Sequence, residues 1–217
     1  MAFDKLLRPA SVAVVGASAS PAKVGHSILH NLVRDGFEGD IYPINPKADE
    51  ILGKKCYSSL TEAPGQVDLA VIVVPRDRVL SVLDDCKRAS VGAAIIVTAG
   101  FGETGAEGRQ LQKEIVQRCR SARITMMGPN CLGLVNPWHK LNASFGQPVG
   151  EPGAIALISQ SGALMTAVQD LAAATHIGFS VLASIGNKAA IDEVDLLQVL
   201  RDDENTRVIT AYLENIT

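Results

Sequence analysis

The stretch Val12–Ser27, VAVVGASASPAKVGHS, decides how the first half of the chain folds. A short apolar run reaches Gly16, and a polar loop then leads to Gly25, where a helical pattern begins. This order predicts a buried strand, a tight turn and a helix N-terminus, whose free N–H groups hold phosphate. The spacing G-x-G-x-x-G is absent, because Ser18 occupies the place of the second glycine. The loop is therefore longer and more polar than a typical NAD-binding turn.

Short apolar runs alternate with helical patterns as far as residue 127. The runs are continuous, as is typical of parallel strands that are buried on both faces. Strand–helix–strand repetition predicts a doubly wound parallel α/β sheet. We expect strands at Val12–Val15, Asp40–Ile44, Leu69–Val73, Ala93–Val97 and Arg123–Met127, and helices at Gly25–Arg34, Arg76–Ala89 and Gly105–Arg120.

A stretch rich in Gly, Pro and Asn separates this first domain, 1–128, from a second α/β run. We expect 129–152 to be an ordered connector and 153–217 to hold the first half of another α/β domain. Three strands make only part of an ordinary doubly wound sheet, so we expect a truncated chain. The expected elements are strands Ala154–Ile158, Phe179–Ser184 and Val208–Leu213, and helices Gly162–Ala174 and Glu193–Asp202.

Composition excludes several classes of protein. The 217 residues carry a net charge of −3 with no basic block, which disfavours nucleic-acid binding and anionic membrane surfaces. No apolar run approaches the roughly 18 residues of a membrane span. The N-terminus lacks the apolar core of a signal peptide, and the four cysteines form no C-x-x-C pair. We therefore expect a cytoplasmic protein with reduced thiols and no zinc site.

The residues that follow the other strands are candidates for ligand binding, because ligands bind at the carboxyl ends of parallel strands. Lys47 stands about where an NAD site places an acidic residue for the ribose, and its ammonium would attract a ribose phosphate. Coenzyme A (CoA) carries a 3′-phosphate and a pyrophosphate. Pro75 and Gly100 close the third and fourth strands. A solvated lysine and ordinary turns are the simpler alternatives.

Five motifs in this order resemble the CoA-binding domain of NDP-forming acyl-CoA synthetases, relatives of the succinyl-CoA synthetase α subunit: VAVVGAS, YPINPK, VIVVP, IIVTAGFGETG and MMGPNCLGLVNP. The resemblance runs from about Leu6 to Glu214. It implies a Rossmann-like CoA-binding domain followed by part of a flavodoxin-like, succinyl-CoA-ligase-type domain. It also implies that CoA is cradled by Gly16, Ala17, Ser18, Lys47, Val74, Pro75, Ala99 and Gly100.

In the second domain, LISQSGA again predicts a strand, a turn and a helix start. Ser159, Ser161 and the N–H of Gly162 are candidates for phosphate binding. A serine nucleophile is disfavoured, because no suitable Asp and His follow in the required order. The resemblance implies that Glu214 supports a catalytic histidine, and a solvated acid at a strand end is the alternative.

The resemblance implies the reversible reaction acyl-CoA + ADP + phosphate = carboxylate + CoA + ATP, through an acyl phosphate and a phosphohistidine. The phosphorylated histidine and the ATP-grasp domain that binds ADP or ATP with Mg²⁺ have no counterpart in this sequence. We therefore expect the chain alone to bind CoA but to have no catalytic activity. Its expected partners are CoA or acyl-CoA and either missing C-terminal segments or an ATP-grasp subunit. A homo-oligomer is an open possibility. His26 and His30 are four apart on a helix, a spacing that could in principle bind a metal, but we interpret them as an ordinary helix face and expect no metal site.

Two alternatives remain. The stretch 137–145, PWHKLNASF, resembles a connector in protein lysine acetyltransferases, where an inactive copy of this region senses acetyl-CoA. An NAD-dependent oxidoreductase is the other, against which Ser18 and Lys47 both count. The acyl group and the preference for ADP or GDP stay undetermined.

Overall fold

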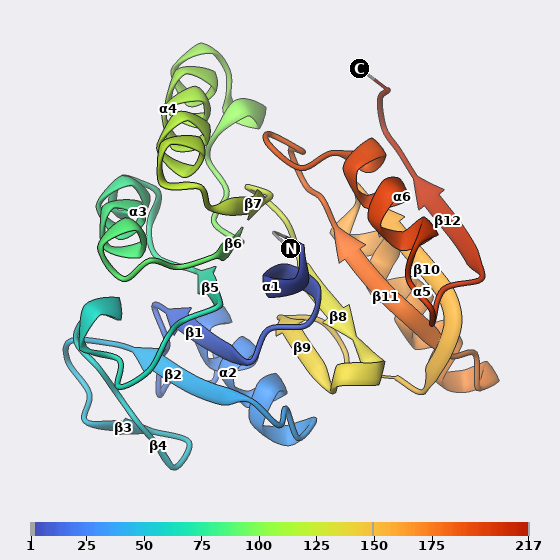
Figure 1. Ribbon diagram of the computed structural model, residues 1–217, viewed down its shortest axis with the longest axis horizontal. Coiled ribbons are helices and arrows are strands. Elements are labelled where there is room, and N and C mark those ends of the chain that lie inside the picture. Colours follow the sequence, from blue (N-terminus) through green and yellow to red (C-terminus); the bar gives the residue numbers. More distant parts are fainter. Residues whose placement is uncertain (1–2, 149, 217) are drawn as a thin grey trace.

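The computed structural model describes residues 3–148 and 150–216, which form two α/β lobes side by side (Figure 1). Each lobe is built on a five-stranded sheet. The hairpin of β8 (Gly133–Asn136) and β9 (Leu141–Ser144) lies in the middle of the molecule, where the two lobes meet (Figure 1). The α/β class expected from the sequence is confirmed.

The first sheet is parallel throughout and has the order β2-β1-β5-β6-β7. The chain therefore crosses over between β1 and β5, which makes the carboxyl ends of these strands the topological switch point where ligands bind in open α/β sheets. The strands are β1 (Ser11–Val15), β2 (Asp40–Ile44), β5 (Leu69–Ile72), β6 (Ala93–Ile96) and β7 (Thr125–Met127).

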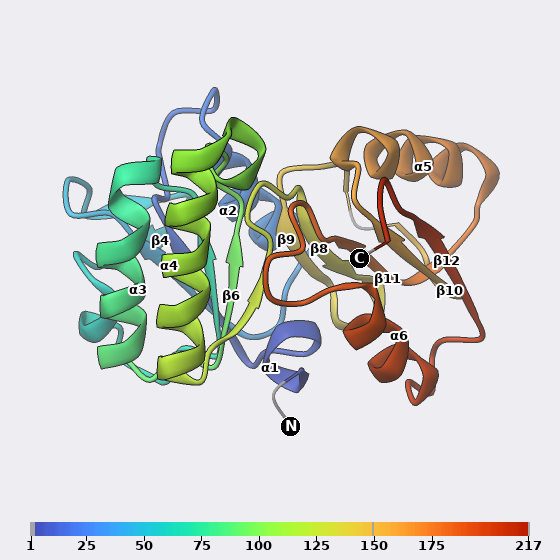
Figure 2. The ribbon, with the colours of Figure 1, turned by 90° about the horizontal axis from the view of Figure 1, so that it is seen from above.

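Both faces of the first sheet are covered by helices, which explains its continuous apolar strands (Figure 2). Val12 and Val14 face one core, which includes residues of α1 (Asp4–Leu7) and α2 (Val24–Arg34). Ala13 and Val15 face a second core on the side of the other two helices. Those helices are α3 (Val79–Arg88) and α4 (Ala106–Ala122).

The second sheet is mixed and has the order β12-β10-β11-β8-β9. β10 (Pro152–Ser159), β11 (Phe179–Ser184) and β12 (Val208–Tyr212) are parallel. α5 (Gly162–Thr175) and α6 (Glu193–Arg201) lie on opposite faces of this sheet (Figure 2).

Two strands of the second sheet lie inside the segment 129–152 that the sequence predicts to be a connector. β8 (Gly133–Asn136) and β9 (Leu141–Ser144) form an antiparallel hairpin, and β8 also pairs with β11. The described residues of this segment are therefore a structural part of the second sheet as well as a link. The domain limits at 128 and 152 stay a prediction.

The lobes share one apolar core, to which Leu32 of α2, Leu134 of β8 and Ile158 of β10 all belong. Asn31 reinforces this contact, since its buried side-chain amide donates to the carbonyls of Ser144 (2.9 Å) and Gly146 (3.1 Å). A continuous apolar interface holds the lobes in one relative orientation. Any site between them is consequently preformed.

The remaining described elements are short: β3 (Glu50–Ile51), β4 (Lys54–Lys55) and the 3₁₀ turns η1 (Leu60–Glu62), η2 (Arg76–Arg78), η3 (Gly102–Thr104) and η4 (Pro137–His139). All four cysteines are buried and free. Within residues 3–148 and 150–216, no helix has the length and apolarity needed to cross a membrane. The same residues contain no group of three His, Cys, Asp or Glu side chains that could hold a metal.

Candidate functional site

A cleft of about 990 Å³ lies where the two lobes meet. Its lining joins strand ends of the first sheet to a helix start and a strand end of the second. Six residues singled out from the sequence lie on it: Val74, Pro75, Ala99, Ser161, Gly162 and Glu214. Gly16, Ala17, Ser18, Lys47, Gly100 and Ser159 are not part of this lining.

The turn after β1 depends on two glycines. Gly16 has φ +97°, and a Cβ there would lie 3.1 Å from the backbone carbon of Val73. A Cβ on Gly25 would lie 2.0 Å from the carbonyl oxygen of Gly16. α2 can therefore approach the loop only because position 25 lacks a side chain. The residue before α2, Lys23, makes no side-chain cap, so the first N–H groups of the helix have no capping side chain.

Asn45 connects the first loop to the residues that follow β2. Its side-chain amide donates to the carbonyl of Ala17 (2.8 Å), and its side-chain oxygen accepts from the N–H of Lys47 (2.8 Å). This places the backbone of Lys47 beside the Gly16 loop, while the Lys47 side chain stays exposed. The sequence analysis missed Asn45 as a brace, although asparagine commonly bonds the backbone two residues ahead.

The loop after β6 is held by two charged side chains. Arg76 donates to the carbonyl of Gly100 (3.1 Å), and the carboxylate of Glu103 accepts from the N–H groups of Gly100 and Phe101. Glu103 also accepts from the side-chain amide of Asn187 (2.6 Å) in the second lobe. Burial raises the pKa of Glu103, but the hydrogen bonds from Asn187 and from the loop N–H groups outweigh it, so the pKa is lowered.

The turn before α5 uses serine hydroxyls internally. Ser159 is fully buried, and its hydroxyl donates to the carbonyl of Ser161 (2.8 Å) and accepts from the N–H of Ser161 (3.1 Å). Ser161 caps the helix by accepting from the N–H of Leu164 (3.2 Å). Ser159 therefore braces the turn, whereas Ser161 and Gly162 line the cleft at a helix N-terminus, which favours an anion.

Glu214 follows β12, and its exposed side chain lines the cleft. Its backbone N–H donates to the side-chain oxygen of Gln160 (2.9 Å). Gln160 also lines the cleft, as does Asn187, and neither was predicted as a site residue. Both follow strands whose ends the topology brings to the cleft, so a known strand order would have indicated them.

The histidines and cysteines of the described residues form no nucleophilic or metal-binding cluster on the cleft. None of the four histidines belongs to its lining. His26 bonds the carbonyl of Ser18 (3.0 Å), and its ring stacks on that of His30. Cys131 does line the cleft, but burial raises the pKa of its thiol to about 12, so it is neutral near pH 7. A serine triad has no support in this geometry.

Comparison with known proteins divides the chain into two domains, and the first match reaches into the β8–β9 hairpin of the second sheet. Residues 10–137 match the family described as CoA binding domain, and residues 152–217 match the succinyl-CoA ligase like flavodoxin domain. The chain is 46% identical over its whole length to the alpha subunit of acetate–CoA ligase [ADP-forming] I from Pyrococcus furiosus, of which it covers 48%. It is also 46% identical, over 96% of its length, to acetate–CoA ligase [ADP-forming] from Methanocaldococcus jannaschii, of which it covers 29%.

A solved structure is similar over the whole chain. The dinucleotide forming acetyl-coenzyme A synthetase 1 of Ca. Korarchaeum cryptofilum, in complex with phosphate and ADP, superposes with a TM-score of 0.96 and 46% identity. The match covers 100% of this chain and 47% of that one. The chain thus spans half or less of the length of these relatives. It belongs to the family of ADP-forming acyl-CoA synthetases, as a CoA-binding domain followed by a succinyl-CoA ligase-like flavodoxin domain.

Proposed function

We propose that this chain is the CoA-binding portion of an enzyme that interconverts acyl-CoA, ADP and phosphate with carboxylate, CoA and ATP. The observation that carries the proposal is the composition of the cleft. One cavity combines the ends of β5 and β6, where Val74 and Ala99 lie, with the N-terminus of α5 at Gly162 and with Glu214. A CoA thiol, a phosphate and a phosphoryl-accepting group can therefore meet in one place.

The nucleotide end of CoA would lie along the switch point of the first sheet. The N–H groups of Gly16 and Ala17 already donate to the carbonyls of Ile44 and Val14, so the N–H of Ser18 and the uncapped start of α2 suit the pyrophosphate. Asn45 holds the backbone of Lys47 next to this loop, and the exposed ammonium of Lys47 suits the 3′-phosphate. The pantetheine arm would then pass the ends of β5 and β6, beside Pro75, into the cleft.

The chemistry would take place at the second lobe's side of the cleft. A phosphate oxygen attacks the thioester carbonyl, and the C–S bond breaks to give an acyl phosphate and CoA thiolate, which takes up a proton. The N-terminus of α5 at Ser161 and Gly162 would stabilise the phosphate through backbone N–H groups. No histidine of this chain lies on the cleft lining, so a histidine from elsewhere would take the phosphoryl group, releasing carboxylate, and pass it to ADP. Glu214 would accept a hydrogen bond from that histidine.

Calorimetric titration of this chain with CoA, and separately with NAD, tests the binding part of the proposal. We expect CoA to bind and NAD to bind far more weakly, because Ser18 replaces a glycine and Lys47 stands in the place of the ribose-binding acid. Binding of NAD without binding of CoA would overturn it. The acetyltransferase alternative shares the CoA half of the site but needs no phosphoryl acceptor, so only the ligase gives ATP-dependent phosphorylation of the complete protein.

A further inference from the structure

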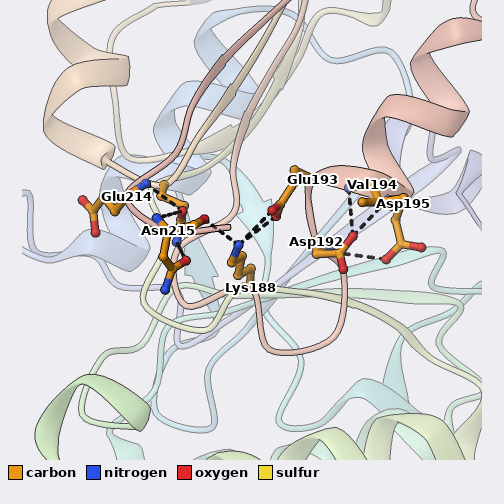
Figure 3. Close-up of polar contacts among 8 residues, drawn as sticks. Lys188, Asp192, Glu193, Val194, Asp195, Glu214 and Asn215 are labelled. Carbon is orange, nitrogen blue, oxygen red and sulfur yellow. Dashed lines mark hydrogen bonds and ion pairs between the residues drawn. The ribbon is translucent and has the colours of Figure 1, made fainter. Parts of the chain in front are cut away.

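A buried ion pair lies behind the cleft, outside its lining. Lys188 follows β11, and its ammonium is 2.9 Å and 3.0 Å from the two carboxylate oxygens of Glu193 (Figure 3). Their side chains are only 6% and 7% exposed. A pair at this depth is expensive to desolvate and is often replaceable by apolar residues without loss of stability. Stability alone therefore does not explain its presence.

The third N–H of the ammonium donates to the backbone carbonyl of Asn215 (2.9 Å), the residue after Glu214. The other side of this turn is held by Gln160, whose side-chain oxygen accepts from the N–H groups of Glu214 (2.9 Å) and Asn215 (3.2 Å). Figure 3 shows the Glu214 carboxylate pointing away from Lys188. Lys188 and Gln160 thus hold the backbone of the Glu214–Asn215 turn from two sides, and the side chain of Glu214 lines the cleft.

The ammonium itself is fixed by its surroundings. Lys188 has φ +41°, and the residues on either side of it bond the first lobe, since the N–H of Asn187 donates to Pro129 (2.9 Å) and that of Ala189 donates to Gly128 (3.1 Å). Glu193 is the first residue of α6, whose start is fixed by a capping box at Asp192. Both partners therefore stand on well-anchored backbone.

We propose that Lys188 is a positioning residue, held by Glu193, that fixes the Glu214–Asn215 turn so that the Glu214 carboxylate meets the phosphoryl-accepting group. The assignment rests on the proposed function, because Glu214 has a task only if a phosphoryl group is transferred in the cleft. Displacement of a reacting group by about 1 Å is enough to slow a step by about 100-fold. The ion pair would act on the phosphoryl step and not on CoA binding.

The test uses the complete enzyme that contains this chain and compares Lys188→Met/Glu193→Met, which leaves no unpaired buried charge, with the wild type. The readouts are the rate of phosphoryl incorporation from radiolabelled ATP and the Kd for CoA. We expect the rate to fall by about 10- to 100-fold with an unchanged Kd. The matched control is Lys140→Met/Glu38→Met, which removes an exposed ion pair of 2.7 Å and should change neither quantity.

A purely structural role is separated by repeating the double substitution in a Glu214→Gln background. If Lys188 acts through Glu214, the double substitution should slow phosphoryl incorporation little further in the Glu214→Gln enzyme. A further fall as large as the one in the wild-type enzyme would overturn the assignment. An unchanged rate in the first comparison would also overturn it. Should the Met pair not fold, Glu193→Asp shortens the carboxylate arm, and it must slow phosphoryl incorporation with the Kd unchanged. A wild-type enzyme that binds no CoA and incorporates no phosphoryl group would refute the proposed function itself, and this inference with it.

Discussion

The two lobes each carry a strand–loop–helix turn near the cleft, and the turns are built in different ways. The turn after β1 relies on missing side chains, because Gly25 lets α2 approach the carbonyl of Gly16. The turn after β10 relies on added hydroxyls, because Ser159 and Ser161 bond its backbone and cap α5. The start of α2 has no capping side chain, whereas the start of α5 is capped by Ser161.

The difference indicates what each turn can hold. A long loop that leads to an uncapped helix start suits an extended ligand with several negative groups, such as the pyrophosphate of CoA. A compact turn with a capped helix suits one small anion that comes and goes during a reaction. Substitutions that exchange the properties of the two turns provide the direct way to challenge this comparison.

The largest expected effect is that of Gly25→Ala. The new Cβ would lie 2.0 Å from the Gly16 carbonyl oxygen, so α2 has to move and the loop with it. We expect a loss of about 3 kcal/mol in the free energy of unfolding, the upper end of typical overpacking costs, and loss of CoA binding. Denaturant unfolding and calorimetry measure both.

Gly162→Ala is the matched control in the other turn. Its Cβ would lie 3.3 Å from the Cβ of Leu132, a contact that a shift of a few tenths of an ångström relieves. We expect less than about 1 kcal/mol of destabilisation, because alanine is favourable in a helix. Equal losses at positions 25 and 162 would contradict the distinction between the two turns.

The helix caps should show the opposite ranking. Ser161→Ala removes the hydroxyl that accepts from Leu164, and such a loss costs about 1 kcal/mol. Lys23→Ala removes no cap, since Lys23 makes none, and should leave the free energy of unfolding unchanged. The comparison fails if the lysine variant is destabilised as much as the serine variant.

Lys47→Ala sharpens the assignment of the first turn to CoA. An exposed ion pair contributes up to about 1 kcal/mol, so the Kd for CoA should rise by about fivefold. The Kd for dephospho-CoA, which lacks the 3′-phosphate, should hardly change. Lys54→Ala, at another exposed lysine, is the control. If the substitution weakened the binding of CoA and of dephospho-CoA equally, Lys47 would not bind the 3′-phosphate.

The smallest effect concerns the contact between the lobes at Glu103. The pKa of Glu103 is lowered in the folded protein, so its bonds contribute stability above the unfolded pKa, and that contribution is lost as the pH falls through the folded pKa. Glu103→Gln should therefore lower the Tm at pH 7 slightly, and the difference from wild type should disappear in acid. A Tm difference that persists unchanged down to about pH 3, below the ordinary glutamate pKa of about 4.3, would contradict this account.

The sequence predicts the parallel strands well, because most are short, largely apolar runs that lie between glycine, proline or polar residues. Asp40–Ile44 and Phe179–Ser184 lie at the predicted residues. The hairpin of β8 and β9 was missed, because its strands have only four residues each and are joined by a 3₁₀ turn, Pro137–His139, instead of a typical two-residue hairpin turn. Pairing of β8 with β11 depends on the packing of the lobes, which no local pattern records.

Site residues that stand close together in one local motif were predicted from the sequence. Site residues that are brought together only by the fold were missed. Ser161 and Gly162 stand in one turn and were found together. The bond from Asn45 to Ala17 joins residues 28 apart, and that from Asn187 to Glu103 joins residues 84 apart. Such long-range hydrogen bonds depend on strand order, which no local motif of the sequence records.

A crystal structure of this chain with CoA tests the central claim most directly, since that claim concerns where the two ends of one ligand lie. The account predicts the pyrophosphate within hydrogen-bond distance of the N–H groups of Ser18 and of the first turn of α2, and the thiol in the cleft beside Gly162. CoA bound away from the ends of β1 and β5, or a cleft that side chains close against the thiol, would contradict it.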